Sequence, residues 1–373
     1  MLSNSNKYTN QETEEQDTSP TTNEGIEEQF IQRGVILEST ATGERSTITC
    51  SFETYKEIIQ IEKATSTVAG SNEGIFKIIN TKKGQHLELT NIGAQLFLAS
   101  RIDTEKILNE LENHALSPIF NAFKEACNET QIKKELAHKK PHEKWTHGES
   151  LDLIELATRI KEKTKNGDFR TALNNHRRSS NKNTRESKKY IRSLFSNHSR
   201  ILALRIDLGH QSSIKSKYQN SELLEAAKIQ RSELFKHLKK KFKNSLLGYI
   251  WKLEYGLEKG YHYHLMLFLD GSQNRQDVTI AKFIGEHWNN EITKGEGNYF
   301  NCNAQKEAYG KYLGIGMISH ADHEKIRNLE KAATYLSKAD YYASLITKGG
   351  RTFGKGNMPS ERANPLGRPR KNS

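Results

Sequence analysis

The sequence predicts an α+β protein whose second half is a ferredoxin-like domain, an antiparallel β-α-β-β-α-β sheet followed by one further helix. Three patterns support this prediction. Residues 200–209 (RILALRIDLG) form an apolar run of the length of a buried strand. A hairpin pattern covers 246–271, and a long amphipathic pattern covers 323–346. A smaller mixed domain is expected to precede this unit.

The elements of the second half follow from local patterns, in chain order. Helical periodicity with Asn or Ser at its start predicts a helix over 220–244. The break from Gly256 to Gly260 predicts a hairpin loop between two strands rich in β-branched and aromatic residues. Leu265, Leu267 and Leu269 of the second strand are expected to pack under the helices. The order is completed by a helix over 275–290, a strand over 314–319 and the final helix, with Asp322 as its N-cap.

The first half has less distinct patterns. Strands are expected at 35–40 and 46–52, and helices at 53–64, 103–116 and 151–163. The predicted organisation is an acidic disordered tail (1–28), a small mixed domain of unknown role (29–130), a basic linker with a helical segment (131–187), the ferredoxin-like domain (188–347) and a basic disordered tail (348–373).

Two histidines in the predicted hairpin indicate a metal site. His262 and His264 are two residues apart in a strand, so both side chains point to the same face. If Tyr255 lies opposite Tyr261 across the loop, Glu254 lies opposite His262 and on that same face. Two imidazoles and one carboxylate form a three-ligand site with open positions for water and substrate. The alternative is that Glu254 is an exposed hairpin residue and the histidines belong to a polar face.

The last predicted helix carries a candidate nucleophile. Ile326, Leu329, Ala333 and Leu336 form its apolar stripe, and Lys331, Tyr335, Lys338 and Tyr342 lie together on the opposite side. Two lysines beside Tyr335 would favour its phenolate and attract a phosphate. The order of preference as nucleophile is Tyr335, then Tyr342, then Tyr341. The alternative is that Tyr335 and Tyr342 pack against another domain.

Charge and composition restrict the function classes. The net charge is +12, and the segments 176–200 and 348–373 hold eight and seven Lys or Arg against one Glu each. Such segments are typical of a polyphosphate partner, although a solvated surface is the alternative for either one. Three scattered cysteines match neither a disulfide framework nor a zinc pattern. With no run of 18 apolar residues, a cytoplasmic protein without a membrane span is expected.

The second half resembles the HUH endonuclease superfamily of rolling-circle replication initiators. It is similar in particular to the replication proteins of filamentous phages (inoviruses) and their cryptic-prophage relatives. The resemblance covers about residues 180–370 and rests on RILALRIDLG, WKLEYGLEKGYHYHLMLFLDG and ATYLSKADYY, which resemble the first-strand, metal and tyrosine motifs. Tyr263 departs from the usual aliphatic residue between the histidines.

The resemblance implies a site-specific nickase. His262, His264 and Glu254 would hold Mg²⁺ or Mn²⁺, Tyr335 would be the nucleophile and Lys338 its supporting cation. Cleavage of single-stranded or extruded origin DNA would leave a 5′-phosphotyrosine and a free 3′-hydroxyl, and the same site would later rejoin ends. No P-loop run occurs in the chain, so a host helicase and DNA polymerase are implied partners in a bacterial cytoplasm.

The C-terminal tail suggests further DNA contacts. PLGRPRK (365–371) resembles an AT-hook core, which lies extended in the minor groove of AT-rich DNA. Arg368, Arg370 and Lys371, together with Lys331, are the predicted DNA-binding residues. Two other functions remain open from sequence. One is a non-catalytic prophage DNA-binding regulator, and the other is an HUH transposase.

Overall fold

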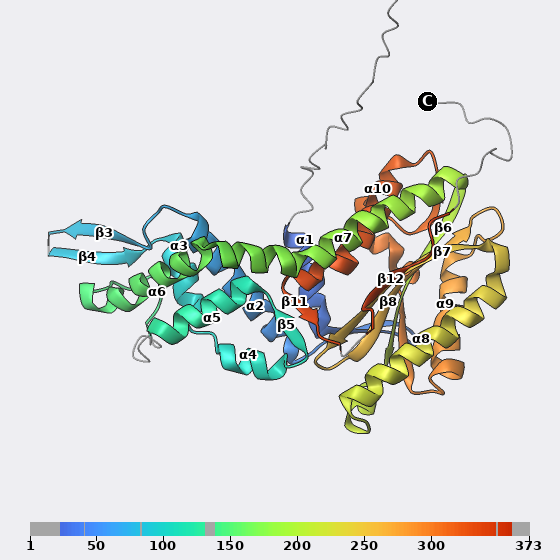
Figure 1. Cartoon of the computed structure of the whole chain (residues 1–373), viewed down its shortest axis with the longest axis horizontal. Helices are drawn as coiled ribbons and strands as arrows, with labels where there is room; N and C mark the ends of the chain where they lie inside the picture. The colour runs from blue at the N-terminus through green and yellow to red at the C-terminus, as the bar shows by residue number, and fades with distance from the viewer. Residues whose placement is uncertain (1–22, 41, 83, 131–138, 348–349, 360–373) are drawn as a thin grey trace, which may run out of the picture.

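The computed structural model describes residues 23–40, 42–82, 84–130, 139–347 and 350–359. It has a mixed α+β structure with antiparallel sheets, which confirms the predicted class. A largely helical unit lies at one end, and the largest sheet lies at the other (Figure 1). The helix α7 (Gly167–Asn197) extends from one unit to the other. Among the described residues, no helix combines the length and apolar character that a membrane span requires.

The large sheet contains the predicted strands of the second half. It consists of β6 (Arg200–His210), β7 (Leu246–Gly256), β8 (Gly260–Asp270), β9 (Gly297–Asn301), β10 (Gly316–Ser319) and β12 (Phe353–Lys355). The order is β10-β6-β8-β7-β12, and β9 also pairs with β6. Strand β8 pairs with one edge of β6. The other edge is shared, because β10 pairs with the beginning of β6 and β9 pairs with its end.

The hairpin has the predicted register. Tyr255 pairs with Tyr261 and Glu254 with His262, so the alternation of side chains places the carboxylate and the two imidazoles on one face. Gly260 has a φ of 65°, a left-handed conformation that favours glycine, and it turns the chain into β8. The turn chemistry and the period of two were therefore sufficient to predict this part of the structure.

Helices cover both faces of the large sheet. On one face, Leu265, Leu267 and Leu269 pack as predicted in a cluster with α8 (Asn220–Phe242) and α9 (Asp277–His287). On the other face, α7 and α10 (His323–Lys338) pack over apolar strand residues such as Ile250 and Phe268. Glu254, His262 and His264 lie on this second face, farther along β7 and β8, beyond the part packed against α7 and α10.

The helical unit has a core of its own. Its elements are α1 (Asn23–Ile31), the 3-10 turn Gln32–Gly34, β1 (Val35–Thr40), β2 (Gly43–Ile48), α2 (Ser51–Gly70), β3 (Phe76–Thr81), β4 (Gly84–Leu89), α3 (Asn91–Ala99), α4 (Thr104–Glu110), β5 (His114–Leu116), α5 (Pro118–Thr130) and α6 (His147–Lys165). The hairpin β1–β2 reaches the large sheet, where the Ser39 hydroxyl accepts a hydrogen bond from the backbone N–H of Asn301.

Two segments predicted to be disordered contain structure. Helix α1 begins within the expected acidic tail, because Ile26 and Phe30 share one helix face and are buried. In the expected C-terminal tail, β12 pairs with β7. Residues 1–22 and 360–373 of these two tails lie outside the described residues.

The boundary between the units also differs from the prediction. Trp145, Leu153 and Ile160 lie in the core of the helical unit, so this unit continues into the segment expected to be a linker. Helix α7 then crosses the boundary placed between 187 and 188 without a break. The basic, polar composition of this segment suggested a linker. The prediction failed because its few apolar residues, at helical spacing, suffice to dock α6 on the core.

Two predicted helices end early, and one predicted strand does too. The helix expected over 103–116 stops at Glu110, because its last residues form β5 and pair with β11 (Ala343–Leu345), far away in the sequence. Helix α10 ends at Lys338 for a related reason, since a 3-10 turn leads from it into β11. Strand β2 ends at Ile48, and the rest of the strand expected over 46–52 leads into α2.

The predicted N-cap of α10 is confirmed, because the Asp322 carboxylate accepts a hydrogen bond from the Lys325 N–H at 3.0 Å.

Candidate metal centre

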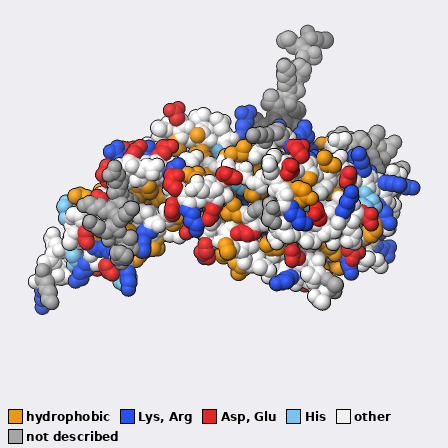
Figure 2. Space-filling model, turned by 90° about the horizontal axis from the view of Figure 1, so that it is seen from below, with side chains coloured by type: hydrophobic (Ala, Val, Ile, Leu, Met, Phe, Trp, Pro, Cys, Tyr) orange, Lys and Arg blue, Asp and Glu red, His pale blue; other side chains and the backbone are white. Residues whose placement is uncertain are grey.

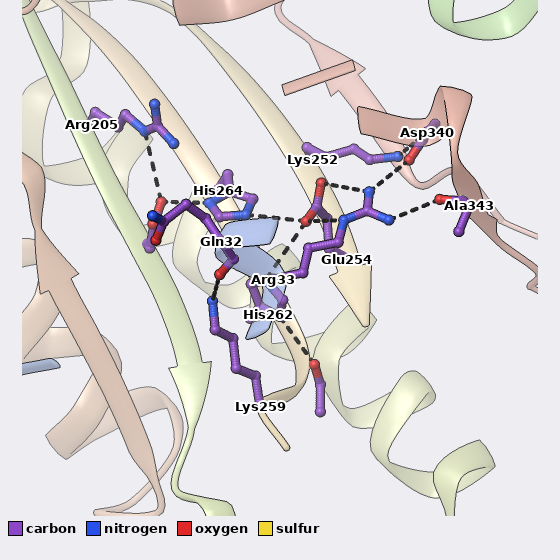
Figure 3. A network of polar contacts seen from close by, with 12 residues as sticks. Gln32, Arg33, Arg205, Lys252, Glu254, Lys259, His262, His264, Asp340 and Ala343 are labelled. Carbon is purple, nitrogen blue, oxygen red and sulfur yellow. Dashed lines mark hydrogen bonds and ion pairs between the residues drawn. The ribbon is translucent and has the colours of Figure 1, made fainter. Parts of the chain in front are cut away.

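Glu254, His262 and His264 form a compact cluster. One ligand atom from each lies within 4.8 Å of the others. Glu254 Oε2 is 3.4 Å from His264 Nε2 and 3.9 Å from His262 Nε2. All three side chains are buried, which excludes the alternative that Glu254 is an exposed hairpin residue. The buried group could hold a metal ion (Figure 3).

Both imidazoles are oriented for metal binding. His262 Nδ1 lies 3.0 Å from the Gly260 carbonyl oxygen, and His264 Nδ1 lies 2.7 Å from Asp207 Oδ1. An Nδ1–H that donates to each acceptor leaves the lone pair on Nε2, which faces Glu254 in both rings. His262 Nε2 is buried and has no hydrogen-bond partner among the described residues. An orphaned nitrogen of this kind fits a metal ligand.

Burial and the neighbouring charges act differently on the three members of the cluster. Burial, with Lys259 and His264 nearby, lowers the pKa of His262 to about 3, so this ring is neutral. Burial also opposes the charged form of His264, but Asp207 and Glu254 outweigh it and raise its pKa. Burial disfavours the Glu254 carboxylate too, yet Arg33 and the histidines hold the pKa of Glu254 well below its usual value. The site therefore contains a buried anion.

The helical unit supplies the partner of that anion. Arg33 Nε donates to Glu254 Oε2 and Nη2 donates to Oε1, each at 3.1 Å. The same guanidinium donates to the Ala343 carbonyl at 2.8 Å and to Asp340 Oδ1 at 3.2 Å. Lys252 forms an ion pair with Asp340 as well. The turn that carries Arg33 thus joins the metal cluster to the segment after α10 (Figure 3).

The metal face is covered more than expected. The sequence predicted a site with open positions for water and substrate, but the turn Gln32–Gly34 lies over this face. Lys259 Nζ donates to the Gln32 carbonyl at 2.9 Å. A small pocket remains beside the histidines, lined among others by Leu37, Asp207, Lys259 and Asn298. This pocket also includes His262 and His264 in its lining, so it borders the cluster directly.

Tyr335 lies on α10 and is partly buried against α1. A Cβ at position 25 would lie 2.7 Å from Tyr335 Oη, so a residue larger than glycine there would require the Tyr335 ring to shift. Burial, then Glu28 and Tyr312, raises the pKa of Tyr335. This environment opposes the phenolate, and neither Lys331 nor Lys338 is among the causes of the shift. In the described part of the chain, no hydrogen bond or ion pair links Tyr335 directly to the three candidate ligands.

The other two tyrosines are not on the helix. Tyr342 follows the 3-10 turn after α10, so it cannot share a helix face with Lys331 and Lys338. Its ring centroid lies 4.9 Å from that of Phe30, and it packs against the core of the helical unit, as the alternative for this residue proposed. Tyr341 packs under the Arg177 guanidinium, 5.1 Å from its ring centroid.

Several residues of the site were missed from sequence. Arg205 and Asp207 interrupt an otherwise apolar strand two residues apart, which could have indicated a polar end of that face. Burial favours protonated Asp207, but His264 and Arg205 lower its pKa below the usual value. No local pattern marks Arg33, Lys252 or Asp340. The predicted DNA-binding residues Arg368, Arg370 and Lys371 lie outside the described residues.

A comparison with known families adds one finding. The family model described as the YagK/YfjJ C-terminal domain matches residues 160–356, more than half of the chain. The match begins near the end of α6 and includes the large sheet, the metal cluster and α10. No curated protein and no solved structure matches the chain.

Proposed function

The chain belongs to the YagK/YfjJ C-terminal domain family, and we propose that it is a metal-dependent endonuclease that nicks one DNA strand by tyrosine attack. The observation that carries this proposal is the buried cluster of Glu254, His262 and His264 with both Nε2 atoms directed at the carboxylate. A ligand set of two imidazoles and a carboxylate with open positions suits metal-assisted phosphodiester chemistry.

The strand order supports the finer assignment to a ferredoxin-like HUH domain. The sheet contains the order β10-β6-β8-β7. A β-α-β-β-α-β chain produces this order when its two middle strands, here β7 and β8, pair as a hairpin. Helices α8 and α9 occupy one face, and the metal cluster lies on the other together with α10. Rolling-circle replication initiators of the filamentous-phage type are the proteins that this arrangement and the motifs resemble.

The residues of this chain have distinct roles in the proposed reaction. His262, His264 and Glu254 would hold Mg²⁺ or Mn²⁺, while Asp207 and the Gly260 carbonyl orient the two rings. A bound divalent ion supplies Lewis-acid polarisation of the scissile phosphate. Tyr335 attacks phosphorus, so that a bond forms from its phenolic oxygen and the bond to the 3′ oxygen breaks. The phenolic proton is transferred overall to the leaving 3′-hydroxyl.

The proposed partners follow from this chemistry. The substrate is a single-stranded or extruded origin segment, and the free 3′-hydroxyl primes synthesis by a host DNA polymerase with a host helicase in a bacterial cell. Reversal of the attack by a second 3′-hydroxyl rejoins ends. Lys338 would contribute a positive charge near the phosphate once the strand is bound.

Covalent trapping tests the proposal. Full-length protein is incubated with circular single-stranded DNA and Mn²⁺, and adducts are separated on a denaturing gel and mapped by peptide mass spectrometry. We expect an adduct at Tyr335 that Tyr335→Phe abolishes and Tyr341→Phe, the matched control, preserves. The double variant His262→Ala/His264→Ala should form no adduct. Phosphotyrosine at another position, or an adduct formed normally by the double histidine variant, would contradict the proposal.

A further inference from the structure

Helix α7 carries a row of positive charges on its exposed side. Arg178, Lys182, Arg185, Lys189 and Arg192 follow one another at spacings of three or four residues, and all five are exposed. At about 100° per residue these side chains fall within one stripe on the helix. The row, which we call the α7 stripe, spans 15 residues (178–192), and the 14 steps between them cover about 21 Å at about 1.5 Å per residue.

The opposite side of the same helix segment is anchored in the protein. Ser187, Ile191 and Leu194 are buried, and the Ser180 hydroxyl donates to the Ser337 carbonyl of α10. Through these contacts α7 covers the sheet face that also carries the metal cluster. The α7 stripe therefore lies on the outer side of α7, above the same sheet face that carries the candidate metal centre, and it points away from the sheet.

The stripe is not neutralised by the protein. Arg178, Lys182, Arg185 and Lys189 form no ion pair within the part of the chain that the structure describes. Arg192 alone is paired, with Glu330 at 2.7 Å, and its side chain is still 69% exposed. Like charges three or four residues apart on a helix destabilise it, so an unpaired row of this kind is best explained by an external polyanion.

Cations elsewhere on the molecule behave differently. On α6, Arg159 is paired with Glu155 and Glu162, and Lys163 is paired with Glu125 and Glu129. The face seen in Figure 2 shows acidic and basic side chains interspersed. The stripe is thus a local feature and does not merely reflect the net positive charge of the chain.

A groove continues the stripe toward α10. It lies between the end of α7 and the start of α10, and its polar lining includes Arg192, His320, His323, Arg327 and Glu330, the carboxylate that pairs with Arg192. Two arginines and two histidines in a groove add donors suited to phosphate oxygens. Phosphate-binding side chains therefore continue from the exposed side of α7 to Arg327 on the helix that bears Tyr335.

We propose that the α7 stripe binds the phosphate backbone of double-stranded DNA next to the nicking site. A straight row of about 21 Å parallels roughly six base-pair steps of about 3.4 Å each. The residues beside the stripe, such as Ser179, Asn181 and Asn183, are polar, whereas a membrane-surface helix needs an apolar face at the interface. The choice of DNA rests on the proposed function, but the binding itself does not require cleavage.

Duplex binding in EDTA tests the stripe without any nicking. Fluorescence anisotropy would compare wild type with Arg178→Gln/Lys182→Gln/Arg185→Gln/Lys189→Gln over a range of salt concentrations. Glutamine is a good helix former, so α7 should persist, and circular dichroism and the melting temperature verify this. The matched control, Lys56→Gln/Lys77→Gln/Lys106→Gln/Arg159→Gln, removes the same charge from paired cations of the helical unit.

The expected result is a loss of affinity with a flatter salt dependence. Four lost phosphate contacts should reduce the slope of log K against log salt by about 3 to 4 and weaken binding at least ~10-fold near 0.1 M salt. The control should bind like wild type. An unchanged slope in the stripe variant would overturn the inference, even if Tyr335 forms its adduct.

Two further arms separate the partner classes. Stripe-dependent binding to double-stranded RNA or to anionic phosphatidylglycerol vesicles, with no binding to duplex DNA, would overturn the choice of DNA. Stripe-dependent binding to duplex DNA in a protein that forms no covalent adduct would instead contradict the proposed nicking and leave the stripe standing.

Discussion

Arg33 and Glu254 are 221 positions apart in the sequence and form a bidentate ion pair, with both contacts at 3.1 Å, at the candidate metal centre. Both side chains are almost completely buried. The pair makes the helical unit a structural part of the site, because the guanidinium lies beside the carboxylate that would bind a cation. The same carboxylate is thus shared between an arginine and a metal ligand set.

Replacing Arg33 with Ala should expose this relationship. Removal of one partner leaves a buried anion uncompensated, so the free energy of unfolding should fall by about 3–5 kcal/mol. Mn²⁺ should restore part of this stability by binding at Glu254, giving Arg33→Ala a larger metal-dependent rise in melting temperature than wild type. Differential scanning fluorimetry with and without Mn²⁺ measures both effects.

The double variant Arg33→Ala/Glu254→Gln is the control for that experiment. It lacks the buried anion and should not respond to Mn²⁺. If Arg33→Ala itself shows no stabilisation by the metal, Glu254 is not a ligand.

Asp207 should contribute to metal affinity without touching the ion. Its carboxylate accepts from His264 Nδ1 at 2.7 Å and so fixes the ring with Nε2 toward the cluster. Asp207→Asn keeps the shape but weakens the acceptor, and Mn²⁺ affinity should fall by about 10–100-fold. Isothermal titration calorimetry checks this, with Asp270→Asn, at the far end of β8, as control. Equal affinities for Asp207→Asn and wild type would show that the carboxylate does not orient the ligand.

Tyr342 should behave as a packing residue. Its ring contacts Phe30 and the core of the helical unit, so Tyr342→Ala should lower the free energy of unfolding by about 2 kcal/mol. Tyr342→Phe keeps the ring and should leave both stability and adduct formation near wild type. Chemical denaturation and the trapping assay test the two parts. Loss of the adduct in Tyr342→Phe would contradict the packing role and support Tyr342 as a nucleophile.

Glu62 should make the stability of the helical unit depend on pH. Burial raises its pKa from 4.5 to about 7, against the opposing effects of Ser117 and Arg177. The folded state then binds the proton more tightly than the unfolded state. The contribution of Glu62 to stability is therefore greatest at low pH and is lost as pH rises from 4.5 to 7, by about 3 kcal/mol in total.

Glu62→Gln removes this titration while keeping the size of the side chain. Its stability should decline less than that of wild type between pH 5 and 7.5 in urea denaturation series. Glu53→Gln, an exposed carboxylate on the same helix, is the control. Parallel pH curves for wild type and Glu62→Gln would contradict the raised pKa.

Local patterns predicted the elements of the large sheet well. The run RILALRIDLG, the glycine-bounded loop and the apolar stripe of Ile326, Leu329, Ala333 and Leu336 are confirmed as a strand, a hairpin and a packed helix face. Each depends on interactions between neighbours in sequence, where the period of two or 3.6 residues decides which side chains are buried. Predictions failed where a distant segment determined the end of an element, as at Glu110 and Lys338.

The sequence by itself determined the cluster of Glu254, His262 and His264, because a tight hairpin sets the register and the alternation of a strand sets the face. Only the tertiary structure decided what surrounds it. Arg33 binds Glu254, and Gly25 lies close to the Tyr335 side chain, because the helical unit docks against the sheet. Such contacts join residues hundreds of positions apart, and their energy comes from burial and charge pairing, which no local periodicity records.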